Sequence, residues 1–194
     1  MYEKTDQIIT ILNRILINSF RKLKTLASFD KLNVIRDVND MYEKVLSFAI
    51  KNYKKLAIYY YGRATDEKKE RKMDDWVDEY LAKYNPLTKY IFVPELERKK
   101  GRLIEIVVNS DTKTKDIDAS LRLWSKMFTQ YAEDITFDVT IQGYKDIGVK
   151  KVIWQTENDT RVCPVCQERD GRVFDIDKVP NKPHIGCRCW VKPY

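Results

Sequence analysis

Every cysteine in this chain, and its only histidine, lies in the last 32 residues of the sequence. They are arranged as Cys163-Pro-Val-Cys166, followed by His184-Ile-Gly-Cys187-Arg-Cys189. Thiolate sulfur and imidazole nitrogen are the ligands of structural zinc, which takes four of them in a tetrahedron. Five such donors at one end of the chain predict that this end folds around a single structural zinc ion.

The spacing of the donors favours one set of four ligands. Cys163 and Cys166 have the separation of a zinc knuckle, and Pro164 between them fixes one backbone angle, so that the two sulfurs converge at little cost in chain entropy. His184 and Cys187 repeat this separation across a glycine. We therefore expect zinc to be bound by Cys163, Cys166, His184 and Cys187, with Cys189 either replacing Cys187 or remaining a neighbouring thiol.

Disulfides and inert buried thiols are the alternative uses of four cysteines. A bridge across Cys187-Arg-Cys189 would be strained. The polar start of the sequence, Met1-Tyr-Glu-Lys-Thr-Asp6, is unlike the secretory signal that would carry the chain to an oxidising compartment. We therefore expect reduced thiols that bind metal.

Composition and charge limit the kinds of partner. No stretch is long and apolar enough to span a membrane, and 43% hydrophobic residues over 194 positions suffice for the core of one or two small domains. The net charge of +7 is a mild bias toward polyanions, because 29 acidic residues are interspersed with 36 basic ones. Basic clusters at 51–55, 68–72 and 98–102, the first leading into Tyr59-Tyr-Tyr61, are candidate helix faces for contact with nucleic acid.

Helices are predicted along the first two-thirds of the chain, where apolar residues recur at steps of three and four. The predicted segments are 8–23, 34–61, 76–84, a helix that Pro94 opens, and 117–135 continuing toward Tyr144. A cap-like break at Ser28-Phe-Asp30 separates the first two helices. The highly charged residues between the second and third suggest a hinge at 62–73.

The clearest period in the chain lies at 117–135. Apolar residues there follow one another at alternating steps of four and three, as in a heptad seam. They are Ile117, Leu121, Trp124, Phe128, Tyr131 and Ile135. A seam of this length packs in a bundle within the chain, or pairs with a second copy, so self-association through 117–135 is the alternative to the bundle.

The residues after Gly148 favour strands. Strands are predicted at 149–156, at 172–176 after an Asp170-Gly171 hairpin turn, and at 186–191. So short a segment buries too small a core to fold alone, and zinc would supply the missing stability. The predicted fold is therefore mainly α, with long helices in a bundle-like or elongated domain at 1–148 and a small β-rich zinc-binding module at 149–194.

The motifs of this C-terminal module resemble a known family. They are Trp154-Gln-Thr156, Asp159-Thr-Arg-Val-Cys-Pro-Val-Cys166, Asp170-Gly-Arg-Val-Phe174, Pro183-His184 and Cys187-Arg-Cys189. In this order they resemble the C-terminal signature of the phage Mu F-type minor head proteins, also called the phage head morphogenesis family. The resemblance is confined to the C-terminal part of the chain, but an ordered set of motifs is far more specific than a single Cys-X-X-Cys.

The resemblance implies a minor head (minor capsid) protein of a bacteriophage. Such a protein is present in the host cytoplasm during assembly and then in the virion, inside the capsid at the portal vertex. The implied partners are the portal protein and the major capsid protein. The protein would also contact packaged DNA through its basic helix faces or be ejected from the head together with the DNA. Some members carry an enzyme or toxin domain after the zinc module; the sequence ends at Pro193-Tyr194, so we expect a structural protein and no enzyme.

Two other functions fit a zinc module in a basic protein. A zinc-supported nuclease needs a histidine to activate water, and His184, the only one, is already assigned to zinc. A DNA-binding zinc-ribbon protein needs base-reading side chains gathered on one helix, and none accompanies the module. Both alternatives are therefore weaker than the assembly protein.

Overall fold

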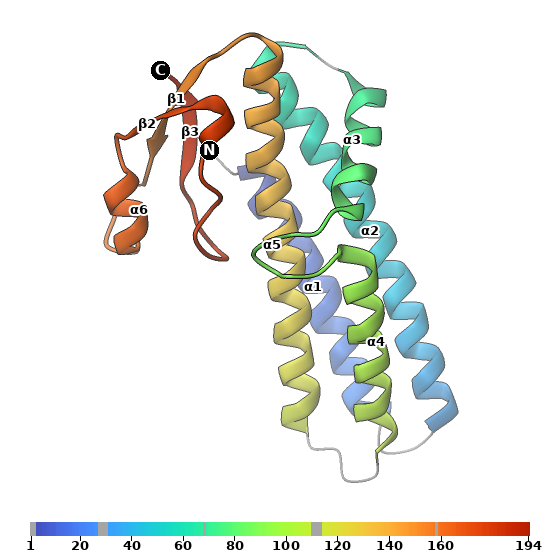
Figure 1. Ribbon diagram of the computed structural model, residues 1–194. Helices are drawn as coiled ribbons and strands as arrows, with labels where there is room; N and C mark the ends of the chain where they lie inside the picture. Colours follow the sequence, from blue (N-terminus) through green and yellow to red (C-terminus); the bar gives the residue numbers. More distant parts are fainter. Residues whose placement is uncertain (1–2, 27–30, 68, 110–113, 158) are drawn as a thin grey trace.

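The computed structural model describes residues 3–26, 31–67, 69–109, 114–157 and 159–194. Within these ranges the chain is mainly helical, and a small sheet lies near the C-terminus (Figure 1). The break expected at Ser28-Phe-Asp30 falls outside the described residues. Long helices in a bundle, as the apolar periodicity predicts, are confirmed.

The bundle is arranged like a four-helix bundle, but two short helices lie end to end in place of the fourth helix (Figure 1). The helices are α1 (Glu3–Leu26), α2 (Lys31–Thr65), α3 (Glu70–Ala82), α4 (Phe92–Val108) and α5 (Thr114–Asp146). The long helices α1, α2 and α5 pack against one another, and α3 and α4 follow each other along α2 to fill the fourth position. The α3–α4 connection therefore crosses the middle of the bundle, beside α5.

The seam at 117–135 faces the interior of this bundle. Ile117, Trp124, Phe128, Tyr131 and Ile135 are all buried, and Leu121 packs against them. The rings of Phe20 from α1 and Trp124 meet edge to face at 5.8 Å. Self-association through this seam is therefore a wrong prediction: the periodicity indicates a buried helix face but does not say whether the covering helices belong to the same chain.

The helix boundaries differ most around the charged run between α2 and α3. The helix predicted to end near Gly62 continues to Thr65, and the helix predicted at 76–84 begins at Glu70. The start of α3 is almost entirely charged, so apolar periodicity misses it; Met73, which is fully buried, is its anchor. Helix α4 begins at Phe92, two residues before the proline expected to open it.

The close approach of α2 and α5 depends on Gly143. A Cβ atom at this position would lie 2.7 Å from the Cβ of Ala64, well inside contact distance. At Gly101 in α4, in contrast, no atom lies within 4 Å of such a Cβ. One glycine is therefore required by packing and the other is not.

These two glycines give a matched pair of variants. Gly143→Ala is expected to lower the free energy of unfolding by about 1–3 kcal/mol, because the two helices must separate. Gly101→Ala is expected to raise it by up to about 1 kcal/mol, through helix propensity alone. Urea unfolding followed by circular dichroism measures both, and a stabilised Gly143→Ala protein would contradict the packing.

The sheet has three antiparallel strands. They are β1 (Lys151–Gln155), β2 (Val173–Asp175) and β3 (Trp190–Pro193), in the order β2-β1-β3. Val152 of the central strand pairs with Phe174 on one side and with Pro193 on the other. The predicted β-rich module is thus confirmed as a small sheet at the C-terminal end.

Two details of the predicted strands are wrong. Asp170-Gly171 does not form a tight hairpin turn, because a short helix, α6 (Pro164–Arg169), lies between β1 and β2, and Asp170 caps its C-terminus. Cys187 and Cys189 do not lie on a strand, since β3 begins only at Trp190. The strand predicted at 186–191 therefore begins four residues later, and both cysteines lie in the irregular loop that precedes it.

A second hydrophobic cluster forms beneath the sheet. Its buried members are Phe137, Val152, Trp154, Cys166, Ile176, Cys187, Cys189 and Val191. Phe137 belongs to α5, and its ring packs edge to face on Trp154 at 5.6 Å. Helix α5 therefore contributes to both cores, one along the bundle and one beneath the sheet. The boundary at 148 stays a prediction.

Candidate metal centre

The first two thiols are positioned by the N-terminus of α6. Cys163 is the N-cap residue, and its Sγ accepts a hydrogen bond from the backbone N–H of Cys166 at 3.4 Å. Pro164 occupies the first turn, where its missing N–H costs nothing. The predicted knuckle is thus the first turn of a short helix, with Cys163 half-buried and Cys166 buried.

The other donors come from the loop that returns to the sheet. Gly186 has φ +77°, a left-handed conformation that a glycine adopts without strain, and it turns the chain between His184 and Cys187. The N–H of Cys187 donates to the carbonyl of His184 at 3.3 Å. This turn leaves His184 partly exposed and delivers Cys187 and Cys189 to the buried side.

All five donors line one small cavity, of about 20 Å³. Their ligand atoms form two groups, each with mutual distances within 4.8 Å. The first group is Cys163, Cys166 and His184, and the second is Cys166, Cys187 and Cys189. Cys166 belongs to both and is therefore the central donor.

The donor set fits a zinc ion. The Sγ atoms of Cys166 and Cys187 are 3.6 Å apart. Zn–S bonds of about 2.3 Å place two sulfur ligands about 3.8 Å apart in a tetrahedron, so this separation suits two ligands of one ion. All four cysteines are free thiols and none forms a disulfide. The cluster can thus hold a metal ion, and which four donors bind it stays a prediction.

The thiols differ in acidity because burial and hydrogen bonding act differently on each of them. Hydrogen bonding to Cys189 lowers the pKa of Cys187 to about 5, whereas burial raises the pKa of Cys166 to about 12. Zinc binds thiolates, so metal binding would displace the remaining protons and remove the repulsion between the sulfurs. The thiol cluster is therefore preassembled in an arrangement that could hold a metal ion.

Two charged residues outside the predicted site fix the metal loop at 181–189: Lys182 acts within the loop, and Glu133 joins the loop to α5. Lys182 is 2% exposed, and its ammonium donates to the carbonyl of Cys187 at 2.7 Å. The carboxylate of Glu133 on α5 accepts from the backbone N–H of Gly186 at 2.8 Å. Sequence reasoning missed both residues, since Lys182 stands between prolines in an apparent turn and Glu133 is one charge among many on a long helix.

Arg188, which lies between the two buried cysteines, forms an ion pair with Asp159. Its guanidinium donates to both carboxylate oxygens of Asp159, at 2.6 and 2.7 Å. The pair joins the loop before α6 to the loop before β3, and all five donors lie in these two loops or in the first turn of α6. Asp159 thus has a structural role, because its pairing with Arg188 connects two loops of the module.

The family comparison covers this same part of the chain. Residues 128–192 match the family model described as Phage Mu protein F like protein. The matched segment includes the second half of α5, the sheet except for Pro193, and all five donors, so it supports the resemblance that the motifs indicate and extends it into the bundle. No curated protein and no solved structure matches the chain significantly.

The charge and apolar features of the remaining chain bear on its partners. In the described parts of the chain, no helix has a run of residues long and apolar enough to cross a membrane.

The basic clusters are largely paired with acidic neighbours: Lys54 with Asp78, Lys99 with Glu95, and Arg102 with Glu105. These pairings weaken the case for a broad polyanion-binding face.

Proposed function

We propose that the protein is a structural component of a bacteriophage head, incorporated during head morphogenesis, whose C-terminal module is held together by one structural zinc ion. The observation that carries the proposal is the convergence of Cys163, Cys166, His184, Cys187 and Cys189 in the segment that matches the Mu F-like family. The helical bundle presents this module and supplies further surface for capsid partners.

The proposed location is the capsid interior at the portal vertex, with the portal protein as the first partner and the major capsid protein as the second. This location rests on the family likeness. The structural support is a helical bundle that carries a small sheet and a Cys/His cluster at one end, an arrangement suited to fixed contacts in an assembly.

Contact with packaged DNA is a secondary part of the proposal. Of the three consecutive tyrosines beside the first basic cluster, Tyr60 and Tyr61 are buried in the bundle. The ring of the third, Tyr59, already has the ammonium of Lys4 4.2 Å from its centre. Base stacking on these tyrosines would require rearrangement, so DNA contact would be electrostatic and sensitive to salt.

An enzymatic role is not proposed. His184, the only histidine, lies in the thiol cluster, 3.0 Å from the carbonyl of Ile185 through its Nδ1 atom. Zinc bound by three or four protein thiolates has little Lewis acidity and no open position for water. The nuclease and the DNA-binding zinc-ribbon protein remain the alternatives.

Incorporation into heads tests the proposal. The protein is produced together with the portal and major capsid proteins of the same phage, and heads are purified with and without portal. We expect the protein in heads that contain the portal and its absence from heads that lack it. Equal amounts in both preparations, or none in either, would contradict a portal-associated head protein.

A further inference from the structure

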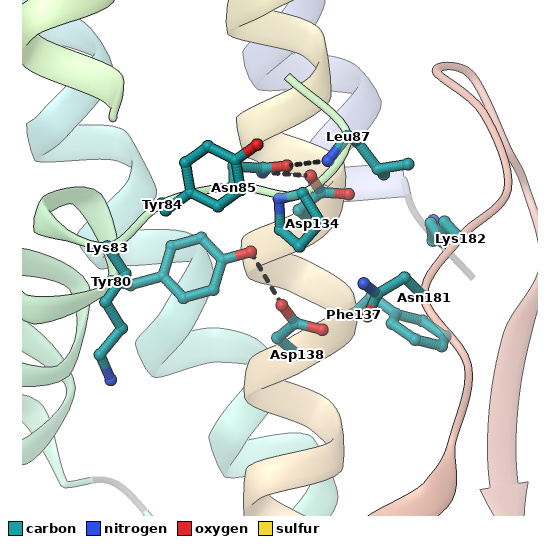
Figure 2. A pocket seen from close by; sticks show the side chains of 11 residues that line it. Tyr80, Lys83, Tyr84, Asn85, Leu87, Asp134, Phe137, Asp138, Asn181 and Lys182 are labelled. Carbon is teal, nitrogen blue, oxygen red and sulfur yellow. Dashed lines mark hydrogen bonds between the residues drawn. The ribbon is translucent and has the colours of Figure 1, made fainter. Parts of the chain in front are cut away.

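A cavity of about 180 Å³ lies between the α3–α4 connection, α5 and the metal loop (Figure 2). Its lining combines aromatic rings, two carboxylates and a few amides. Tyr80 and Tyr84 flank one side, Phe137 lies opposite, and Asp134 and Asp138 stand on α5 between them. This cavity is separate from the cavity that contains the thiol cluster.

Asp138 retains hydrogen-bonding capacity inside the cavity. Its Oδ2 accepts from the hydroxyl of Tyr80 at 2.8 Å, while no hydrogen bond to its Oδ1 comes from the described residues (Figure 2). Burial raises the pKa of this carboxyl to about 6, so the ionised group has lost favourable hydration. A cationic donor beside Oδ1 would restore that lost interaction.

Asp134 is held in place by two amides. Asn85 donates to its Oδ2 at 2.8 Å, and Gln130 donates at 2.7 Å to either oxygen. Asn85 also accepts from the backbone N–H of Leu87 at 2.8 Å, which fixes the connection above the cavity. Asp134 thus adds a second, rigidly positioned carboxyl group, whose pKa is raised by burial.

The carboxylates are not arranged for a metal ion. Throughout the described residues, groups of three or more His, Cys, Asp or Glu ligand atoms within 4.8 Å occur only in the thiol cluster. The walls are aromatic instead. Tyr80 is braced by Trp76, whose ring stacks on it at 4.9 Å. Aromatic faces beside a carboxylate suit an organic cation, an alkylammonium or a guanidinium.

Both cationic lining residues have partners of their own, although the positive charge of Lys182 also opposes the rise that burial causes in the pKa of Asp134 and of Asp138. Lys83 pairs with Glu79 at 2.7 Å, and Lys182 donates to the carbonyl of Cys187. The rim is apolar and open, because Tyr84 is 59% exposed and Leu87 37% exposed. Exposed apolar side chains around a cavity that contains carboxyl groups are typical of a protein interface in which the cavity receives an anchor residue from the partner.

We propose that this cavity receives the arginine or lysine side chain of a partner polypeptide, with Asp138 as its counter-charge and Tyr84 and Leu87 as contacts for the partner's flanking apolar residues. The charge complementarity and the apolar rim together favour a polypeptide over a free small cation. The site goes beyond the proposed function, since it requires neither the metal ion nor a phage partner.

Calorimetry on the full-length protein tests the cavity with a small probe and its neutral isostere. We expect n-butylguanidinium to bind at least about tenfold more tightly than n-butylurea, because a charge-assisted hydrogen bond is gained. Asp138→Asn, which keeps an acceptor for Tyr80, is expected to remove that preference. Glu105→Gln deletes the same charge at an exposed position near the far end of α4 and should leave it unchanged. Equal binding of the two probes would overturn the site, and this comparison needs no variant.

A peptide probe distinguishes a partner polypeptide from a free cation. Acetyl-Leu-Arg-Leu-amide is expected to bind at least about tenfold more tightly than n-butylguanidinium, because its leucines bury apolar surface on the rim. Leu87→Ala should reduce peptide affinity and leave the affinity for n-butylguanidinium unchanged. A peptide that binds no more tightly than the small cation would overturn the assignment to a polypeptide partner.

Discussion

Replacing Cys166 with serine is expected to abolish zinc binding and to unfold the C-terminal module while the helical bundle persists. Cys166 belongs to both donor groups, and its buried sulfur also lies in the core beneath the sheet. Structural zinc contributes on the order of 10 kcal/mol of binding free energy, more than a small sheet can replace by packing. Zinc content measured by mass spectrometry should fall from one ion per chain to nearly none.

Val165 provides the matched control. It lies next to Cys166 in the same short helix but is exposed, so Val165→Ser should keep zinc, the fold and the near-ultraviolet circular dichroism of Trp154. Far-ultraviolet circular dichroism should change little in either variant, because the long helices supply that signal. A Cys166→Ser protein that retains one zinc ion and the tryptophan signal would show that the account of the site is wrong.

Trp124→Ala is expected to produce the largest loss in the bundle, about 3–5 kcal/mol of unfolding free energy. Trp124 is 1% exposed and lies between the rings of Phe20 and Phe128, at 5.8 and 6.4 Å. Alanine would leave a cavity between α5 and the neighbouring helices, and the long helices cannot move enough to close it. Guanidinium unfolding followed by circular dichroism at 222 nm measures the loss.

Leu123, its neighbour on α5, provides the control for this variant. Leu123 is 53% exposed, so Leu123→Ala should change the free energy of unfolding by no more than about 0.5 kcal/mol. Similar losses in the two variants would mean that the seam is not packed as described.

Much of the helical fold follows from sequence because apolar periodicity directly reports a buried helix face. The seam that ends at Ile135 is the clearest case, and each of its residues packs in the core. The start of α3 could not be found this way, since Glu70 to Lys72 are exposed charges in a helix anchored by Met73. Local periodicity also could not identify the helices that cover the seam, because these depend on the arrangement of the whole chain.

The candidate site was predictable only in its donors. Cysteine and histidine spacing identifies the donors because few other functions need these residue types together. The contacts that attach the site to the bundle are long-range: Glu133 accepts from the N–H of Gly186, and the Nζ atom of Lys182 lies 5.6 Å from the centre of the Phe137 ring on α5. No local pattern marks such contacts. The fourth ligand stays open because both Cys187 and Cys189 approach Cys166.

The division at 148 and the hinge at 62–73 stay predictions. Tyr61 donates to the carboxylate of Asp146 at 2.6 Å, and Lys72 pairs with the same carboxylate, so both sides of the proposed hinge are attached to the end of α5. Phe137 similarly places part of the module's core on α5. We therefore expect a fragment beginning at 149 to fold less well than one beginning at 128, where the family match starts.

Intact mass measurement of freshly purified protein, native and then denatured without reductant, tests the zinc-stabilised module most directly. We expect one zinc ion per chain under native conditions and, once the metal is released, four reduced thiols. A metal-free chain whose denatured mass shows two disulfides would contradict a zinc-stabilised module. The four cysteines would then form disulfide bonds in place of a metal site, and the proposed function would lose its structural basis.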